Sequence, residues 1–92
     1  MAKTEITLAG SVDIRTLLPI LTEAEARARR SREGAHLELD CDAVEDFTSL
    51  SLALLVKSRR ILRECGADLC LTSCGERIRA RMVHPLFEAL CT

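Results

Sequence analysis

Two adjacent hydroxyl side chains, Thr48 and Ser49, are the residues of this 92-residue chain best placed to do chemistry. They follow an acidic stretch and stand at the expected start of a long helix. Either hydroxyl can cap that helix by accepting a hydrogen bond from a backbone N–H, and capping needs only one. A phosphoryl group on Ser49 would place about two negative charges beside the unpaired N–H groups of the helix start. Ser49, with Thr48 as the alternative, is a candidate phosphorylation site.

The same helix carries more apolar residues than one buried face requires. A projection at about 100° per residue places one set toward the core, namely Leu54, Leu55, Ser58, Ile61, Leu62 and Cys65. Leu52 and Val56 then project to the opposite side. We expect a partner-binding surface around the helix start, formed by Leu50, Ser51, Leu52, Ala53, Val56, Arg59 and Arg60. The alternatives are that the last helix of the chain or a homodimer covers this surface.

The other reactive side chains form no recognisable catalytic or metal-binding motif. The cysteines are odd in number and lack CxxC spacing; they are Cys41, Cys65, Cys70, Cys74 and Cys91. Cys70 and Cys74 with His84 make only a weak metal-binding pattern, so structural thiols are expected. His36 and His84 have no acid or nucleophile partner at a defined spacing. We therefore expect no enzyme, no metal and no cofactor.

Composition argues against several other functions. Thirteen Lys and Arg against fourteen Asp and Glu give a formal charge of -1, so no positive field favours nucleic acid. With no Trp, no Tyr and two Phe, the chain also lacks aromatic faces for stacking bases. No apolar run approaches the roughly 20 residues of a membrane span. The expected protein is cytoplasmic and reduced, without direct membrane insertion.

Changes in hydrophobic period predict alternating strands and helices. The expected strands are short and cover residues 6–8, 36–41 and 69–71. The expected helices run from about Leu17 to a stop at Gly34, from about Thr48 or Ser49 to Cys65, from Glu76 to about Met82, and over a last turn opened by Pro85. Thr16 is the expected cap of the first helix, with Pro19 in its first turn, and residues 42–46 are expected to form an acidic loop.

This order of elements predicts the fold class. Strands joined through helices pair in parallel by right-handed crossovers. The strands alternate apolar and polar residues instead of being apolar throughout, so the helices should pack on one face of the sheet. The length allows one core. The expectation is a single α/β domain over residues 1–92, with a small, mainly parallel sheet.

Four segments carry a resemblance to a known family. They are Gly10-Ser11-Val12-Asp13, Leu37-Glu38-Leu39-Asp40, the stretch 44–55 and Gly66-Ala67-Asp68-Leu69. Over nearly the whole chain they resemble a STAS domain, the fold of bacterial anti-sigma factor antagonists. The usual family signature at the helix start is Asp-Ser-Ser-Gly-Leu or Asp-Thr-x-Gly-Leu. In register, Thr48 stands at the aspartate, Ser49 at the phosphoacceptor and Ser51 at the glycine.

The resemblance implies a non-enzymatic signalling protein that acts in transcription regulation. Its partner would be an anti-sigma factor with serine-kinase activity, which phosphorylates it and thereby blocks association until a phosphatase removes the phosphate. Asp13 lies in a resembling segment and joins the expected partner-binding residues.

The first half of the chain also looks like the STAS-only cytoplasmic subunit of the Mla lipid-transport ABC complex. That similarity implies a different partner, an ABC-transporter ATPase subunit, and a role as a structural regulator. A third alternative is a signalling accessory module that has lost phosphorylation.

Overall fold

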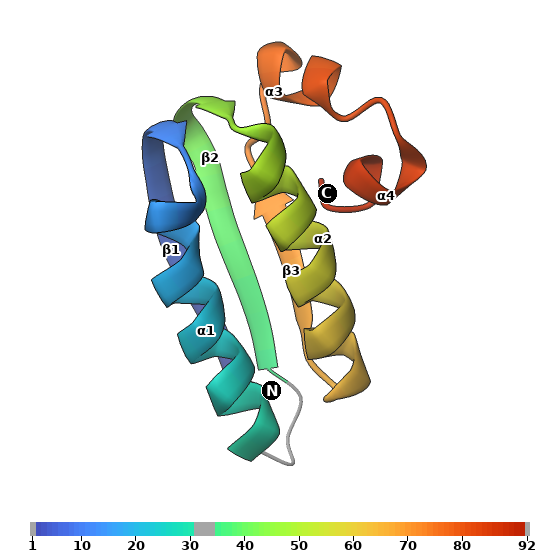
Figure 1. Cartoon of the computed structure of the whole chain (residues 1–92). Coiled ribbons are helices and arrows are strands. Elements are labelled where there is room, and N and C mark those ends of the chain that lie inside the picture. The colour runs from blue at the N-terminus through green and yellow to red at the C-terminus, as the bar shows by residue number, and fades with distance from the viewer. Residues whose placement is uncertain (1, 31–34, 92) are drawn as a thin grey trace.

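A computed structural model describes residues 2–30 and 35–91. Its strands are β1 (Ala2–Val12), β2 (Ala35–Phe47) and β3 (Asp68–Thr72), and its helices are α1 (Ile14–Arg30), α2 (Ser49–Glu64), α3 (Glu76–Arg81) and α4 (Pro85–Glu88). The strands form one parallel sheet in the order β1-β2-β3. The two long helices, α1 and α2, lie side by side on the same face of this sheet (Figure 1). The expected α/β class and parallel pairing are confirmed.

The core lies between this face of the sheet and the two long helices. Leu39 and Leu71 of the strands and Leu55 of α2 have no exposed surface. They belong to one buried apolar cluster that also includes Leu17 and Leu21 of α1. Removal of this apolar surface from water is the main favourable term in folding. No described helix is both long and apolar enough to cross a membrane.

The opposite face of the sheet carries polar side chains in three cross-strand rows. Side chains alternate between the two faces of a strand, so neighbours of the buried leucines point away from the helices. The strand register then defines the rows as Lys3, His36 and Asp68, then Glu5, Glu38 and Cys70, then Thr7, Asp40 and Thr72. We call this surface the polar sheet face.

The prediction of an acidic loop is wrong, because residues 42–46 continue β2 as far as Phe47. This part of β2 pairs with the end of β1 across two register shifts. At the first shift, the Asp42 N–H donates to Asp40 Oδ1 at 3.0 Å. Each bulge inserts an unpaired residue, which interrupts the alternation by which a strand is recognised in a sequence.

The first long helix also begins earlier than expected. Asp13 caps it, since Asp13 Oδ1 accepts hydrogen bonds from the N–H groups of Arg15 at 2.9 Å and Thr16 at 3.2 Å. Thr16 is therefore not the cap. The helix starts at Ile14, so Pro19 lies inside it, beyond the first turn. The expected helix stop at Gly34 lies outside the described residues.

The C-terminal segment is attached to the outer edge of β3 and brings several sulfur atoms together. The Leu71 N–H donates to the Leu90 carbonyl at 2.7 Å, and Leu71 pairs with Cys91 in an isolated parallel bridge. Cys91 Sγ lies 2.9 Å from Cys74 Sγ and 3.2 Å from Met82 Sδ. The five cysteines are free thiols. Burial raises the pKa of Cys41 from 9.0 to about 11 and, together with contact to Cys74, raises the pKa of Cys91 to about 12.

These raised pKa values predict a loss of stability at alkaline pH. A thiol whose pKa is higher in the folded state stabilises the fold fully below its unfolded pKa of about 9, and this contribution is lost as the pH rises through the folded value. The free energy of unfolding, measured with urea, should be level up to about pH 9 and then fall by at most about 1.4 kcal/mol per pH unit for each buried thiol. The sequence contains no tyrosine, so no phenol titrates in the same pH range as these thiols.

A variant in which Cys41 and Cys91 are both replaced by alanine provides the control. Its free energy of unfolding should fall less steeply above pH 9 than that of the wild-type chain. A wild-type curve that stays level up to pH 11 would contradict the prediction.

Candidate functional site

The start of α2 is held by a buried polar junction with the end of β1. The Val12 carbonyl accepts hydrogen bonds from the Thr48 N–H at 3.0 Å and from Ser51 Oγ at 3.0 Å. Ser51 has no exposed surface, and its Oγ also lies 2.8 Å from the Thr48 carbonyl. Residues two apart on a helix point about 200° apart. With Ser51 held inward, Ser49 faces the solvent.

The two candidate hydroxyls have different roles at this junction. Thr48 is the N-cap of α2, and its Oγ1 accepts a hydrogen bond from the Ser51 N–H at 3.2 Å. The Thr48 hydroxyl also donates to Ser51 Oγ at 3.1 Å. Ser49 is the first residue of the helix, outside this capping arrangement. Ser49 is thus the better placed of the two to accept a modification.

An arginine that the sequence analysis did not single out lies beside Ser49. Arg81 of α3 donates from Nη2 to the Phe47 carbonyl at 3.0 Å, and the same nitrogen lies 3.5 Å from Ser49 Oγ. Its Nε lies 3.5 Å from Asp46 Oδ1. Arg81 therefore holds the end of β2 and brings a positive charge to the candidate phosphorylation site. No local sequence pattern signals this contact, because 32 residues separate Arg81 from Ser49.

The outer surface of α2 begins at Ser49 and continues along one stripe. Ser49, Ala53 and Arg60 are exposed and Val56 is half-buried. Their spacing of four, three and four residues keeps them on one side of the helix. Leu50, next to Ser49, leaves 68% of its surface exposed. We call Ser49, Leu50, Ala53, Val56 and Arg60 the outer face of α2.

Leu52 is the main correction to the expected partner-binding surface. It is only 3% exposed and packs in the same buried cluster as Ile78 and Met82. The sequence projection assumed that one flank of α2 was open, but α4 packs against α2 and α3 packs at the end of β2. Ser51 is also buried, so neither side chain is available to a partner without a rearrangement of the helix start.

The buried face of α2 is rotated relative to the projection. Ser51 and Leu52 belong to it, whereas Leu54, Ile61 and Cys65, expected on the core side, are only half-buried.

Two further expected contact residues are engaged within the chain. The Arg59 guanidinium is half-buried, with Nε 3.4 Å from Asp68 Oδ1. Asp13 caps α1. Both have intramolecular roles that account for their positions.

The basic end of α2 forms a shallow pocket with the last helix. The pocket has a volume of about 470 Å³ and is lined by Val56, Arg59, Arg60, Arg63, Glu64 and Leu86. Leu86 belongs to α4 and leaves 58% of its surface exposed. The last helix therefore covers part of this side of α2, as one alternative anticipated. Three arginines against one glutamate give the pocket a positive charge.

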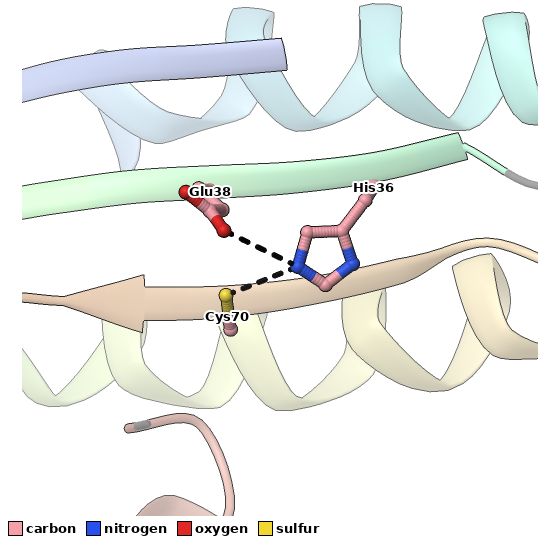
Figure 2. Close-up of side chains that lie close together, drawn as sticks. All are labelled: His36, Glu38 and Cys70. Atoms are coloured by element: carbon pink, nitrogen blue, oxygen red, sulfur yellow. Dashed lines mark hydrogen bonds and ion pairs between the residues drawn. The ribbon is translucent and has the colours of Figure 1, made fainter. Parts of the chain in front are cut away.

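A second group of functional side chains lies on the polar sheet face, where His36, Glu38 and Cys70 point toward one another (Figure 2). His36 Nε2 lies 3.4 Å from Cys70 Sγ and 3.7 Å from Glu38 Oε1. His36 is thus not isolated, contrary to the sequence interpretation. Both contacts use the same ring nitrogen, whereas a nucleophile–histidine–carboxylate relay uses both nitrogens of the ring.

Cys70 is a poor nucleophile in this arrangement. Burial, and after it the charge of Glu38, raises the pKa of the Cys70 thiol, which favours the unreactive protonated form. The geometry therefore does not indicate cysteine catalysis.

Only part of this group is visible in the sequence. His36 and Glu38 are two residues apart in an alternating strand, which places both on one face. The approach of Cys70 depends on the pairing of Glu38 with Cys70 between β2 and β3. Comparisons of the chain with known protein-family models and with curated proteins find no match.

Ser49 and Ser51 make a matched pair for testing the junction. Ser51→Ala removes a buried hydroxyl that forms hydrogen bonds with two carbonyls and one hydroxyl. It should lower the free energy of unfolding by about 1–3 kcal/mol. Ser49→Ala changes an exposed side chain and should alter it by less than about 0.5 kcal/mol. Urea unfolding of both variants measures the difference. Equal effects would contradict the assigned roles.

Proposed function

We propose that this protein is a non-enzymatic interaction module of the anti-sigma factor antagonist type, which binds a protein partner through the outer face of α2 and is switched by phosphorylation of Ser49. The observation that carries the proposal is the position of the Ser49 hydroxyl. It is exposed at the first residue of a 16-residue helix, 3.5 Å from the Arg81 guanidinium and next to the exposed Leu50.

The surroundings of Ser49 suit a phosphoryl group. The first N–H groups of a helix have no intrahelical acceptors, and the helix dipole favours negative charge there. A phosphate on Ser49 would also lie within reach of Arg81, which forms strong charge-assisted hydrogen bonds with phosphate oxygens. A phosphate on Ser49 would therefore have both the N–H groups of the helix start and the Arg81 guanidinium as hydrogen-bond donors.

The same position allows the charge to control association. Leu50, Ala53 and Val56 supply apolar surface next to Ser49. A charge buried among apolar residues at the centre of an interface lowers the affinity of the complex. A phosphate at the edge of this surface would retain its water and oppose docking. The unmodified chain is accordingly the form that binds.

The identity of the partner rests on the resemblance to STAS domains. The proposed partner is an anti-sigma factor with serine-kinase activity, and the proposed setting is bacterial signal transduction in the cytoplasm. An ABC-transporter ATPase subunit, the partner in the Mla-type alternative, would bind the outer face of α2 without phosphorylation.

The kinase proposal predicts a single phosphorylation event. The purified chain should be incubated with ATP, Mg²⁺ and the anti-sigma-type serine kinase encoded nearest to its gene. Intact mass should rise by one phosphate in the wild-type chain and in Thr48→Ala, but not in Ser49→Ala.

Phosphate transfer that persists in Ser49→Ala would contradict the site assignment. A stoichiometric complex with a co-encoded ABC ATPase, formed without any phosphate, would favour the transporter role instead.

The docking surface is tested by charge insertion. Leu50→Glu should weaken the complex with the kinase at least about tenfold, since it places a charge within the interface. Val83→Glu is the matched control, because Val83 is also an exposed apolar residue, at 81%, and lies outside the outer face of α2. Calorimetric titration gives both affinities. Equal weakening by the two variants would show that the complex does not depend on this surface.

A further inference from the structure

The polar sheet face holds a group of ligand atoms that the proposed function does not use. Nitrogen of His36, oxygen of Glu38 and sulfur of Cys70 all lie within 4.8 Å of one another. We propose that these three side chains bind a divalent transition-metal ion of the zinc class across β2 and β3. The site is independent of Ser49 and of the outer face of α2.

The distances between the ligand atoms fit one bound ion. Zinc lies about 2.0–2.1 Å from a histidine nitrogen and about 2.3 Å from a thiolate, so a tetrahedral site separates these atoms by about 3.5 Å. The structure separates His36 Nε2 from Cys70 Sγ by 3.4 Å. A nitrogen and a carboxylate oxygen would be about 3.3–3.5 Å apart, and His36 Nε2 lies 3.7 Å from Glu38 Oε1. His36 Nε2 thus lies within a few tenths of an ångström of the required distance from each of the other two ligand atoms, and those two atoms lie within 4.8 Å of each other.

Glu38 and Cys70 both approach the same nitrogen of His36, and this arrangement favours a bound metal ion over a proton relay. In Figure 2 both dashed lines end on the same atom of the His36 ring, His36 Nε2, with the carboxylate on one side and the thiol on the other. A neutral nitrogen cannot donate to Glu38 and accept from Cys70 at once. A cation among the three groups would accept electron pairs from all of them.

The donor set selects the class of ion. Thiolate and imidazole ligands suit zinc and similar transition metals, whereas magnesium and calcium prefer sites made of oxygen atoms. One sulfur, one nitrogen and one carboxylate oxygen therefore point to Zn²⁺ or Co²⁺. Three protein ligands also leave a fourth position for water or for a donor from another molecule.

The strands hold the ligands in place before an ion arrives. Glu38 and Cys70 are register partners on neighbouring strands, and His36 is two residues before Glu38 on the same face. All three therefore come from paired backbone with little freedom to move apart. Sites on regular elements are more precise than sites on loops.

The charges around the group favour a cation. Lys3 lies 3.3 Å from Glu38 Oε2, the carboxylate oxygen opposite the one that approaches His36. Glu5 also pairs with Lys3, at 3.5 Å, and so offsets part of its charge. Among the described residues in and beside the three rows, the acidic groups Glu5, Glu38, Asp40 and Asp68 outnumber the basic Lys3 and Arg59.

Cobalt provides a direct test because its absorption reports the ligand type. The reduced full-length chain should be titrated with Co²⁺, and a thiolate-to-cobalt charge-transfer band should appear and saturate at one ion per chain. Zn²⁺ should abolish the band, and Mg²⁺ should not. Cys70→Ser and His36→Gln should eliminate the band, and Glu38→Gln should weaken Zn²⁺ binding by at least about tenfold.

Cys74→Ser is the matched control, since it removes a thiol from the separate sulfur group near Cys91 and should retain the band. Circular dichroism of each variant verifies the fold, and His36→Gln decides the result if Cys70→Ser fails to fold. The proposal is overturned if the wild-type chain gives no thiolate band, if the band survives in Cys70→Ser, or if Cys74→Ser abolishes it.

Discussion

The architecture depends on a sheet of three strands with both long helices, α1 and α2, on the same face. Alternation along β2 and β3 sends Leu37, Leu39 and Leu71 under α1 and α2, where their burial supplies the main driving force for folding. The same alternation sends the intervening residues to the opposite face. Because no apolar layer is needed there, that face has room for charged and metal-ligating side chains. The core and the polar group around His36 are therefore two consequences of one pattern.

A second constraint acts where β1 meets α2. The Val12 carbonyl accepts two hydrogen bonds from the first turn of the helix, one from backbone and one from the Ser51 hydroxyl. A buried carbonyl needs such partners, so the junction holds the Ser51 side chain on the inner side of α2. Ser49 and Leu50 then lie at the surface, and Leu52 packs in the core with Ile78 and Met82.

The sequence predicted the order of elements and the parallel sheet because both follow from local periodicity. It also identified Thr48 and Ser49 at the start of α2. It misplaced Leu52, because periodicity gives only the angles between residues on a helix and not which flanks other elements cover. It took residues 42–46 for a loop because the bulges interrupt the strand pattern.

By itself, the sequence determined the fold class and the hydroxyls at the start of the central helix, since helical and strand periods and the cap residue Thr48 act over a few residues. The tertiary structure alone decided that Arg81 lies beside Ser49 and that Cys70 meets His36 and Glu38. These contacts join residues more than 30 positions apart. They depend on strand register and on the docking of α3, which the packing of the whole chain specifies and no short segment contains.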